Sequence, residues 1–396
     1  MINKDTAVII LLIVIVFVLF FRSEYNEEGM INIAPINNPE WSRNKCDYYM
    51  NKTHTNVLSK NKIGKNENNW DFYFPCAYDQ INKEIKSMPI KSEGKYFIID
   101  NADQITAKNL LWDNIVSHHG LDRAKLISPE TFVLSRQSDI DRLKNTHYSG
   151  KIYILKRNVQ RQEGLKITDN LSEITVEKGK YVLAQELLQD PYTIGGRKIN
   201  LRVYVLIVCQ GENMDVYVYN NGFMYYTKDE FKKGSKEDGP NITTGYVERW
   251  VYKVNPLTHK DFKAYLDDTS RKLIFPVEKV LREQGLLISD VIFSRINRLI
   301  ADIFISFKGK VCRPGNKLCE NVTYQLFGAD VAINDTLQPT IMEVNKGPDL
   351  SPKDERDGTV KYNMVQDVYK ILGALPNPNN DFMKLLDIEK NKVSYY

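Results

Sequence analysis

Residues 325–345, QLFGADVAINDTLQPTIMEVN, decide the fold of this chain. The apolar character of both halves predicts two adjacent strands. Asp330 lies in the first predicted strand and Glu343 in the second, and Asn345 follows two residues later on the same face as Glu343. The two strands would therefore present two carboxylates and an amide oxygen at one level.

This set of oxygen atoms is suited to Mg²⁺ held against nucleotide phosphates. The alternative interpretation is the ordinary polarity of an edge strand. Against it stands the apolar sequence around Asp330 and Glu343, which makes the two acids costly to bury unless a cation neutralises them. We therefore predict a magnesium site at Asp330, Glu343 and Asn345.

A second pattern occupies residues 195–208, GGRKINLRVYVLIV. Lys198, Asn200 and Arg202 alternate along one face of a predicted strand, while the apolar residues between them face the other way. Two cations and an amide on one surface suit a triphosphate or an acyl phosphate. A solvated charged face is the usual alternative, but this row leads into a strand apolar enough to be central.

The length and composition indicate a folded chain with more than one lobe. At 396 residues it exceeds one ordinary compact core. Apolar residues make up 42% and charged residues 26%, which excludes both a disordered chain and a polytopic membrane protein. The formal charge of +4 is small for this length, so we predict no nucleic-acid partner.

The five cysteines form no CxxC pair, so neither a zinc site nor a disulfide framework is predicted. Cys312 and Cys319 could pair around the turn at Pro314–Gly315, but two free thiols are the simpler interpretation in a reducing compartment. The five Asn-x-Ser/Thr sequences are attributed to chance in an Asn-rich chain, and an extracellular binding domain is the least favoured interpretation.

An uncharged apolar segment, TAVIILLIVIVFVLFF, occupies residues 6–21. It predicts a single-pass membrane anchor rather than a cleaved signal peptide, because no small-x-small cleavage site follows it. Lys4 mildly favours an N-terminus on the cytosolic side. A body that consumes ATP needs a nucleotide pool, however, and on that ground residues 23–396 are predicted to be cytosolic.

The rest of the chain is predicted to be α/β (α+β). Residues 30–68 show neither helical nor strand periodicity and are interpreted as a tether, so order is expected from Trp70 onward. The predicted segments are an anchor at 1–22, a tether at 23–69, a small N-terminal lobe at 70–105, a central lobe at 106–188, a C-terminal lobe with the metal site at 189–380, and a tail at 381–396.

Three blocks in order resemble the tubulin tyrosine ligase-like family: residues 127–167 (ISPETFVLSRQSDIDRLKNTHYSGKIYILKRNVQRQEGLKI), 183–208 (LAQELLQDPYTIGGRKINLRVYVLIV) and 324–348 (YQLFGADVAINDTLQPTIMEVNKGP). The resemblance covers roughly residues 70–372, and three ordered blocks are more specific than any single one. It implies an ATP-grasp fold with ATP held between two α/β lobes.

The resemblance also implies roles for residues of the central lobe. Lys156 would contact the α- and β-phosphates, and Lys108 would be the lysine of the earlier lobe. Gln185, Glu186 and Leu188 would form the hinge that contacts adenine through backbone and amide groups.

In the C-terminal lobe, Lys198 and Arg202 would act in catalysis by holding the terminal phosphate and the acyl phosphate formed from it. Asn200 belongs to the same nucleotide-binding row. Thr243, in the sequence NITTGY, would lie near the nucleotide.

The resemblance likewise assigns Mg²⁺ to Asp330, Glu343 and Asn345. Arg161 and Gly164 would belong to a flexible loop that closes over the phosphates.

The chain departs from the family pattern around the amino-acid pocket. Asn200 replaces a common aspartate, Thr244 an asparagine, and Asn241 a histidine. Residues 217–225 hold no arginine, whereas the family's corresponding strand carries arginines for the donor or acceptor, so a donor carboxylate loses its bidentate partner.

The activity implied is a two-step ATP- and Mg²⁺-dependent ligation. A carboxylate attacks the γ-phosphate to give an acyl phosphate, which a free amine then converts to an amide, mainly through positioning and charge stabilisation. The expected partners are a free amino acid and a protein acceptor with an acidic tail, such as tubulin, for which Lys228, Lys232, Lys233 and Lys236 could form a basic track. The alternative is a catalytically silent membrane-anchored ATP-binding scaffold.

Overall fold

The computed structural model describes residues 33–393 apart from 47–49, 159–163, 177–178 and 388–391. The chain divides into a first unit, Met1–Ala34, and a second, Pro35–Tyr396, which holds every helix and strand named here. The predicted anchor at residues 6–21 lies outside the described residues. None of the helices that are described is long and apolar enough to cross a membrane.

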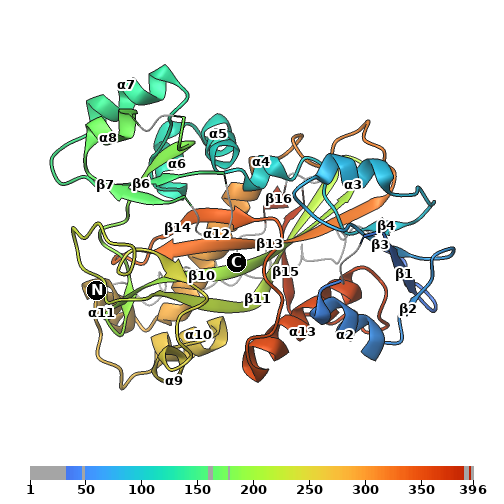
Figure 1. Ribbon diagram of the computed structural model, residues 1–396. Helices are drawn as coiled ribbons and strands as arrows, with labels where there is room; N and C mark the ends of the chain where they lie inside the picture. The colour runs from blue at the N-terminus through green and yellow to red at the C-terminus, as the bar shows by residue number, and fades with distance from the viewer. Residues whose placement is uncertain (1–32, 47–49, 159–163, 177–178, 388–391, 394–396) are drawn as a thin grey trace, which may run out of the picture. The chain divides into compact units, whose positions relative to one another are not determined.

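The centre of the structure is a twelve-stranded sheet built around β10 (Arg197–Gln210) (Figure 1). Nearly every residue of β10 is buried, as its apolar sequence predicts. β11 (Asn213–Thr227) and β13 (Val322–Ile333) pair with it on either side, both antiparallel. β14 (Pro339–Asn345) then pairs antiparallel with β13, which confirms the two adjacent strands predicted for residues 325–345.

The segment predicted as a small N-terminal lobe belongs to this same sheet. β4 (Lys95–Tyr96) lies parallel to β13, and β3 (Phe72–Phe74) lies parallel to β4. The sheet continues through β1 (Glu40–Arg43) to β2 (Gly64–Lys65). Residues 70–105 therefore do not form a sheet of their own.

The predicted tether is wrong from residue 40 onward. β1 and β2 are strands there, and Asn51 caps the N-terminus of α2 (Lys52–Lys60), which packs against α13 (Glu355–Ile371). These strands are too short to show periodicity, and partners distant in sequence hold them, so no local pattern reveals them.

The predicted tail at 381–396 also contributes to the sheet. β15 (Phe382–Asp387) pairs antiparallel with β11, with Met383 opposite Val218, and β16 (Lys392–Val393) follows it. β15 covers the edge that β11 would otherwise expose.

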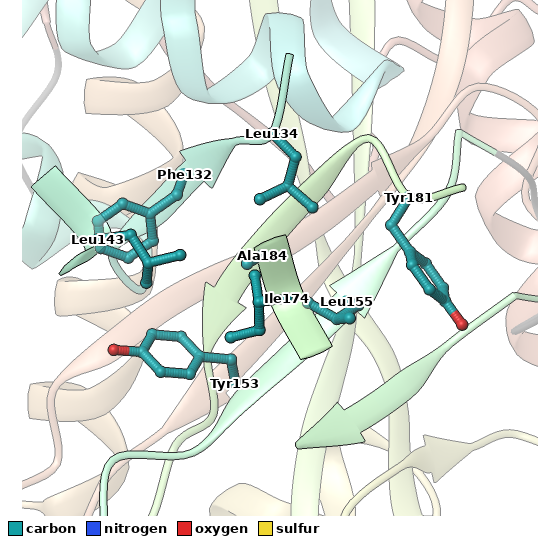
Figure 2. Packing of buried hydrophobic residues seen from close by; sticks show 8 residues of the cluster. All are labelled: Phe132, Leu134, Leu143, Tyr153, Leu155, Ile174, Tyr181 and Ala184. Carbon is teal, nitrogen blue, oxygen red and sulfur yellow. The ribbon is translucent and has the colours of Figure 1, made fainter. Parts of the chain in front are cut away.

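A second sheet of four strands is formed by β5 (Thr131–Val133), β8 (Leu183–Glu186), β6 (Tyr153–Lys156) and β7 (Lys166–Thr168), in that order. Figure 2 shows the apolar cluster on one face of it, where Phe132, Tyr153 and Leu155 pack with side chains from nearby helices. The residues of β6 that alternate with these point to the opposite face. That face carries Ile154 and Lys156, which line the large cavity of the protein.

Helices complete both parts. The apolar α12 (Ile288–Ile305) packs against β14, β15 and α10, which explains its buried stripe. The remaining helices are α3 (Ile81–Ser87), α4 (Asp103–Thr106), α5 (Lys108–His119), α6 (Leu121–Ile127), α7 (Gln137–Thr146), α8 (Leu171–Val176), α9 (Val251–Val254), α10 (His259–Asp267) and α11 (Pro276–Glu283).

The expectation of free cysteines is wrong for four of the five. Cys46 is bonded to Cys76 and Cys209 to Cys312, whereas Cys319 is a free thiol. Each pair joins segments that the fold brings together from distant parts of the sequence, so spacing alone did not reveal it.

Candidate active site

A cavity of about 680 Å³ opens beside the β10 row and is large enough for a nucleotide with a second small ligand. Its walls come from both sheets. The small sheet contributes Ile154 and Lys156, and the large sheet contributes residues of β10, β11, β13 and β14. This arrangement agrees with a ligand held between two α/β parts.

The alternating row predicted on β10 faces this cavity. Lys198, Asn200 and Arg202 all line it, and all three are buried. Their apolar neighbours Ile199 and Leu201 are fully buried on the other face. The prediction that this row is not a solvated strand face is confirmed.

The two predicted acids stand opposite each other. Asp330 and Glu343 are register partners on β13 and β14, and both line the cavity. Asn345 donates from its Nδ2 to Glu343 Oε1 at 3.2 Å, so its amide oxygen is the atom that could act as a metal ligand. The structure brings all three predicted residues together.

Protein cations lie beside both acids. Arg202 Nε donates to Asp330 Oδ1 at 2.6 Å and Arg202 Nη2 to Oδ2 at 3.1 Å, while Lys108 Nζ lies 3.5 Å from Glu343 Oε2. Burial raises the pKa of Asp330 although Arg202 opposes it. Burial also works against ionisation of Glu343, but Lys108 and Lys156 outweigh it and lower that pKa. Protein cations therefore outweigh burial at Glu343 but not at Asp330, and burial of the two acids does not by itself establish a metal at this site.

The donor set still fits Mg²⁺. Two carboxylates and an amide oxygen are the hard ligands that this ion takes, usually with phosphate and water completing its shell. No cluster of three or more His, Cys, Asp or Glu side chains with metal-site geometry occurs among the described residues. A metal at this site would therefore depend on Asn345 and on a phosphate ligand as well as on the acids.

Two buried lysines line the cavity. Lys156 Nζ donates to Gln185 Oε1 at 2.6 Å, and Lys198 Nζ donates to the carbonyl of Leu188 at 3.2 Å. Burial lowers the pKa of Lys156 to about 8, and burial together with Lys156 lowers the pKa of Lys198 to about 8. Both ammonium groups would gain from an anion in the cavity.

The structure gives the predicted hinge residues a different arrangement. Gln185 lies beneath Lys156, where its Nε2 donates to Thr131 Oγ1 at 3.0 Å, and Glu186 forms an ion pair with Lys151. The described residues that line the large cavity do not include these two side chains or Leu188. Gln185 is thus placed to hold Lys156.

Leu187 lines the cavity in their place. It lies with Ile154, Leu165 and Ile242 in an apolar cluster of the cavity wall, a surface suited to a flat ring. Leu187 directly follows β8 and lies two residues beyond Gln185, and because its N–H donates to the carbonyl of Ile152, continued strand alternation puts it on the same face as Gln185. That periodicity was the signal in the sequence that could have found it.

The NITTGY block also lies at the cavity. Thr243 and Thr244 form β12 beside the end of β11, and both line the wall. Asn241 donates from Nδ2 to the carbonyls of Ser235 and Glu237, and its Oδ1 is buried without a hydrogen-bond partner, as is Oδ1 of Asn200. Two such buried oxygens in a cavity wall point to a ligand or water that donates to them.

The predicted loop falls only partly within the described residues, and Arg161 lies outside them. Gly164 has φ of +68°, and an added Cβ would lie 2.6 Å from Arg157 Cδ, so the position favours glycine. The basic track is partly engaged in ion pairs, since Lys233 contacts Asp190 and Lys236 contacts Asp169.

A cluster of charged residues that the sequence pattern did not reveal lines the same cavity. Lys361 pairs with Asp357 at 2.8 Å, and Lys353 Nζ donates to the carbonyl of Gly245 at 3.1 Å. Arg249 and Asp349 complete this group. It brings cations to the site although residues 217–225 hold no arginine, because it comes from segments outside that strand.

Comparison with known proteins supports the family resemblance of the sequence. The model of the tubulin-tyrosine ligase family matches residues 95–381. The chain belongs to the tubulin-tyrosine ligase family.

Curated relatives share low identity with it. The tubulin monoglutamylase TTLL4 of Mus musculus is 25% identical over 290 residues, which cover 69% of this chain and 23% of the relative. A probable beta-tubulin polyglutamylase of Tetrahymena thermophila is 23% identical, covering 64% of this chain and 22% of its own length. The tubulin polyglutamylase TTLL5 of Mus musculus is 24% identical over 68% of this chain and 20% of its own. The chain thus spans about a fifth to a quarter of these relatives.

Proposed function

We propose that this chain is an ATP- and Mg²⁺-dependent carboxylate-amine ligase that joins a free amino acid to a protein acceptor. The observation that carries the proposal is the meeting of Lys198 and Arg202 with the pair Asp330 and Glu343 in one cavity. The names of the relatives, which are tubulin glutamylases, support a protein acceptor such as tubulin and glutamate as a donor.

In this proposal, ATP lies with its adenine at the apolar cluster of Leu187 and its phosphates at Lys156 and Lys198. A carboxylate of the acceptor attacks the γ-phosphorus, ADP leaves, and the acyl phosphate that forms lies beside Arg202. The amine of the donor then attacks the acyl carbon, phosphate leaves, and an amide bond results. Mg²⁺ at Glu343, Asp330 and Asn345 would offset the charge of the transferred group.

The second charged cluster would bind the donor amino acid. Lys353 and Arg249 suit its carboxylate, and Asp349 suits its ammonium group until that group is deprotonated for attack. This assignment replaces the arginines that residues 217–225 lack.

A silent ATP-binding scaffold is the second candidate, and the bidentate contact of Arg202 with Asp330 favours it. In that arrangement Arg202 and Asp330 bind each other. Arg202 is then not available to an acyl phosphate, and Asp330 is not available to a metal. The two candidates differ in turnover rather than in nucleotide binding.

The test is to incubate the full chain with Mg-ATP, acidic tubulin-tail peptides and each common amino acid in turn, and to follow phosphate release and peptide mass. A ligase gives release that depends on one amino acid, adds its residue mass to the peptide, and is lost in Glu343→Gln. Glu283→Gln is the matched control, because Glu283 is an exposed helix residue outside the cavity. Tight nucleotide binding without turnover in any combination would establish the scaffold instead.

A further inference from the structure

The four paired cysteines lie in two separate parts of the folded body. Cys46 follows β1 and Cys76 follows β3, and their Cα atoms are 6.0 Å apart across 30 residues. β1 and β3 are parallel neighbours, so their ends lie at one edge of the sheet, where Asn44 N donates to Phe74 O at 3.0 Å. The backbone thus holds these two positions at the separation that a disulfide requires.

The second pair joins the central strand to the segment after α12. Cys209 lies near the end of β10, and its Cα is 5.4 Å from that of Cys312, which is 103 residues later in the chain. Both side chains are buried. Nearby, Gly211 N donates to Cys319 O at 3.0 Å, so backbone hydrogen bonding holds the same segment against the strand.

Burial alone explains these pairs poorly. A buried cysteine is often a small apolar residue, which would account for Cys209 and Cys312. Cys46 and Cys76 are partly exposed, however, and gain little from burial. Two pairs that use four of five cysteines, at positions far apart in sequence, are typical of proteins that fold where thiols are oxidised, because cytosolic thiols are kept reduced.

We propose that the folded body of this chain resides in an oxidising compartment, such as the lumen of the secretory pathway, and not in the cytosol. If the chain is the ligase proposed above, its acceptor is then not cytosolic tubulin but an acidic segment of a protein that shares that compartment, and ATP must be supplied there. The acceptor's location rests on the proposed function, whereas the compartment of the body is argued from the cysteines and does not depend on that function.

The proposal reverses the predicted cytosolic location, which depended only on the need for a nucleotide pool. If the predicted anchor at residues 6–21 spans a membrane, its weak charge asymmetry points the same way as the disulfides, because Lys4 favours a cytosolic N-terminus and therefore a body on the other side.

Thiol counting on the full chain expressed in eukaryotic cells tests the compartment. Lysis in acid first preserves the thiol state, and the protein is then denatured near neutral pH with N-ethylmaleimide so that every free thiol, buried or exposed, is blocked. The disulfides are next reduced, and the newly exposed thiols are labelled with maleimide-polyethylene glycol. The expected result is four labels. Complete blocking of all five cysteines, with no label after reduction, would show a reduced body and overturn the proposal.

Serine variants establish which cysteines pair. Cys46→Ser should leave two labels, since its partner is blocked, and Cys319→Ser should leave four. Three or fewer labels in Cys319→Ser would show that Cys319 takes part in the bonding and would contradict the assigned pairs. Because Cys46 is partly exposed, Cys46→Ser remains informative even if Cys209→Ser does not fold.

The failures of the two proposals are distinguishable. Reduced cysteines in a chain that adds an amino acid to acidic peptides would refute the oxidising compartment and support the ligase. Four labels in a chain without amino-acid-dependent phosphate release would support the oxidising compartment and refute the ligase.

Discussion

Arg202 on β10 holds both carboxylate oxygens of Asp330 on β13, at 2.6 and 3.1 Å, and the two residues are register partners of adjacent strands. Arg202 also lies over the ring of Tyr225 at 4.9 Å. The guanidinium is thereby fixed in direction at the cavity wall. This ion pair links the two sequence motifs, because each supplies one of its members.

Removal of Arg202 should destabilise the protein through its partner. Arg202→Met leaves the carboxylate of Asp330 buried and uncompensated, and we expect a loss of about 3–5 kcal/mol in the free energy of unfolding. The double variant Arg202→Met, Asp330→Asn should recover most of this loss. Urea unfolding without nucleotide measures both, and costs that simply add would contradict the coupling.

Lys198 should lower the stability of the folded protein although it contributes to ATP binding. Its ammonium is buried, and no carboxylate pairs with it among the described residues. Since its folded pKa of about 8 lies below the ordinary 10.5, the protonated lysine costs stability below pH 8, and the cost disappears as pH rises toward 10.5.

We therefore expect Lys198→Met to raise the unfolding free energy at pH 7 by on the order of 1–3 kcal/mol and to abolish measurable ATP binding. Thermal unfolding and calorimetric titration give the two readings. Lys236→Met, at an exposed surface pair, is the control and should change neither. A less stable Lys198→Met would refute the assignment of burial as the cause.

Nucleotide affinity should fall with rising pH. Both Lys156 and Lys198 have pKa values of about 8, so each is protonated at pH 7 and mostly neutral at pH 9.5. Because phosphate favours the charged lysines, ATP binding above pH 8 requires proton uptake. The Kd for ATP should therefore rise on the order of ten- to a hundredfold from pH 7 to 9.5. Titrations in buffers of different ionisation enthalpy report the protons, and a flat profile would exclude both lysines as phosphate ligands.

Much of this site could be predicted from the sequence because alternation along a strand is a local signal. The row of Lys198, Asn200 and Arg202, and the opposition of Asp330 to Glu343, both follow from period two in strands apolar enough to be buried.

The rest depended on contacts between distant segments. The join of β1 to β3, the bond of Cys209 to Cys312, and the approach of Lys353 to Gly245 have no local pattern. The pairing of Asp330 with Arg202 shows the same limit, because burial cost could be read from the sequence but the identity of the paired cation could not.

The charged group at Lys353 and Arg249 should determine the affinity for the donor amino acid rather than the affinity for ATP. Lys353→Met removes a charge-assisted contact with a carboxylate, and we expect the KM for the donor to rise about ten- to a hundredfold with ATP affinity unchanged. Arg356→Met is the matched control, since Arg356 lies nearby in the chain but binds Asp261 outside the cavity. Equal losses for donor and ATP would place this group at the nucleotide instead, and an unchanged donor KM would remove it from the site.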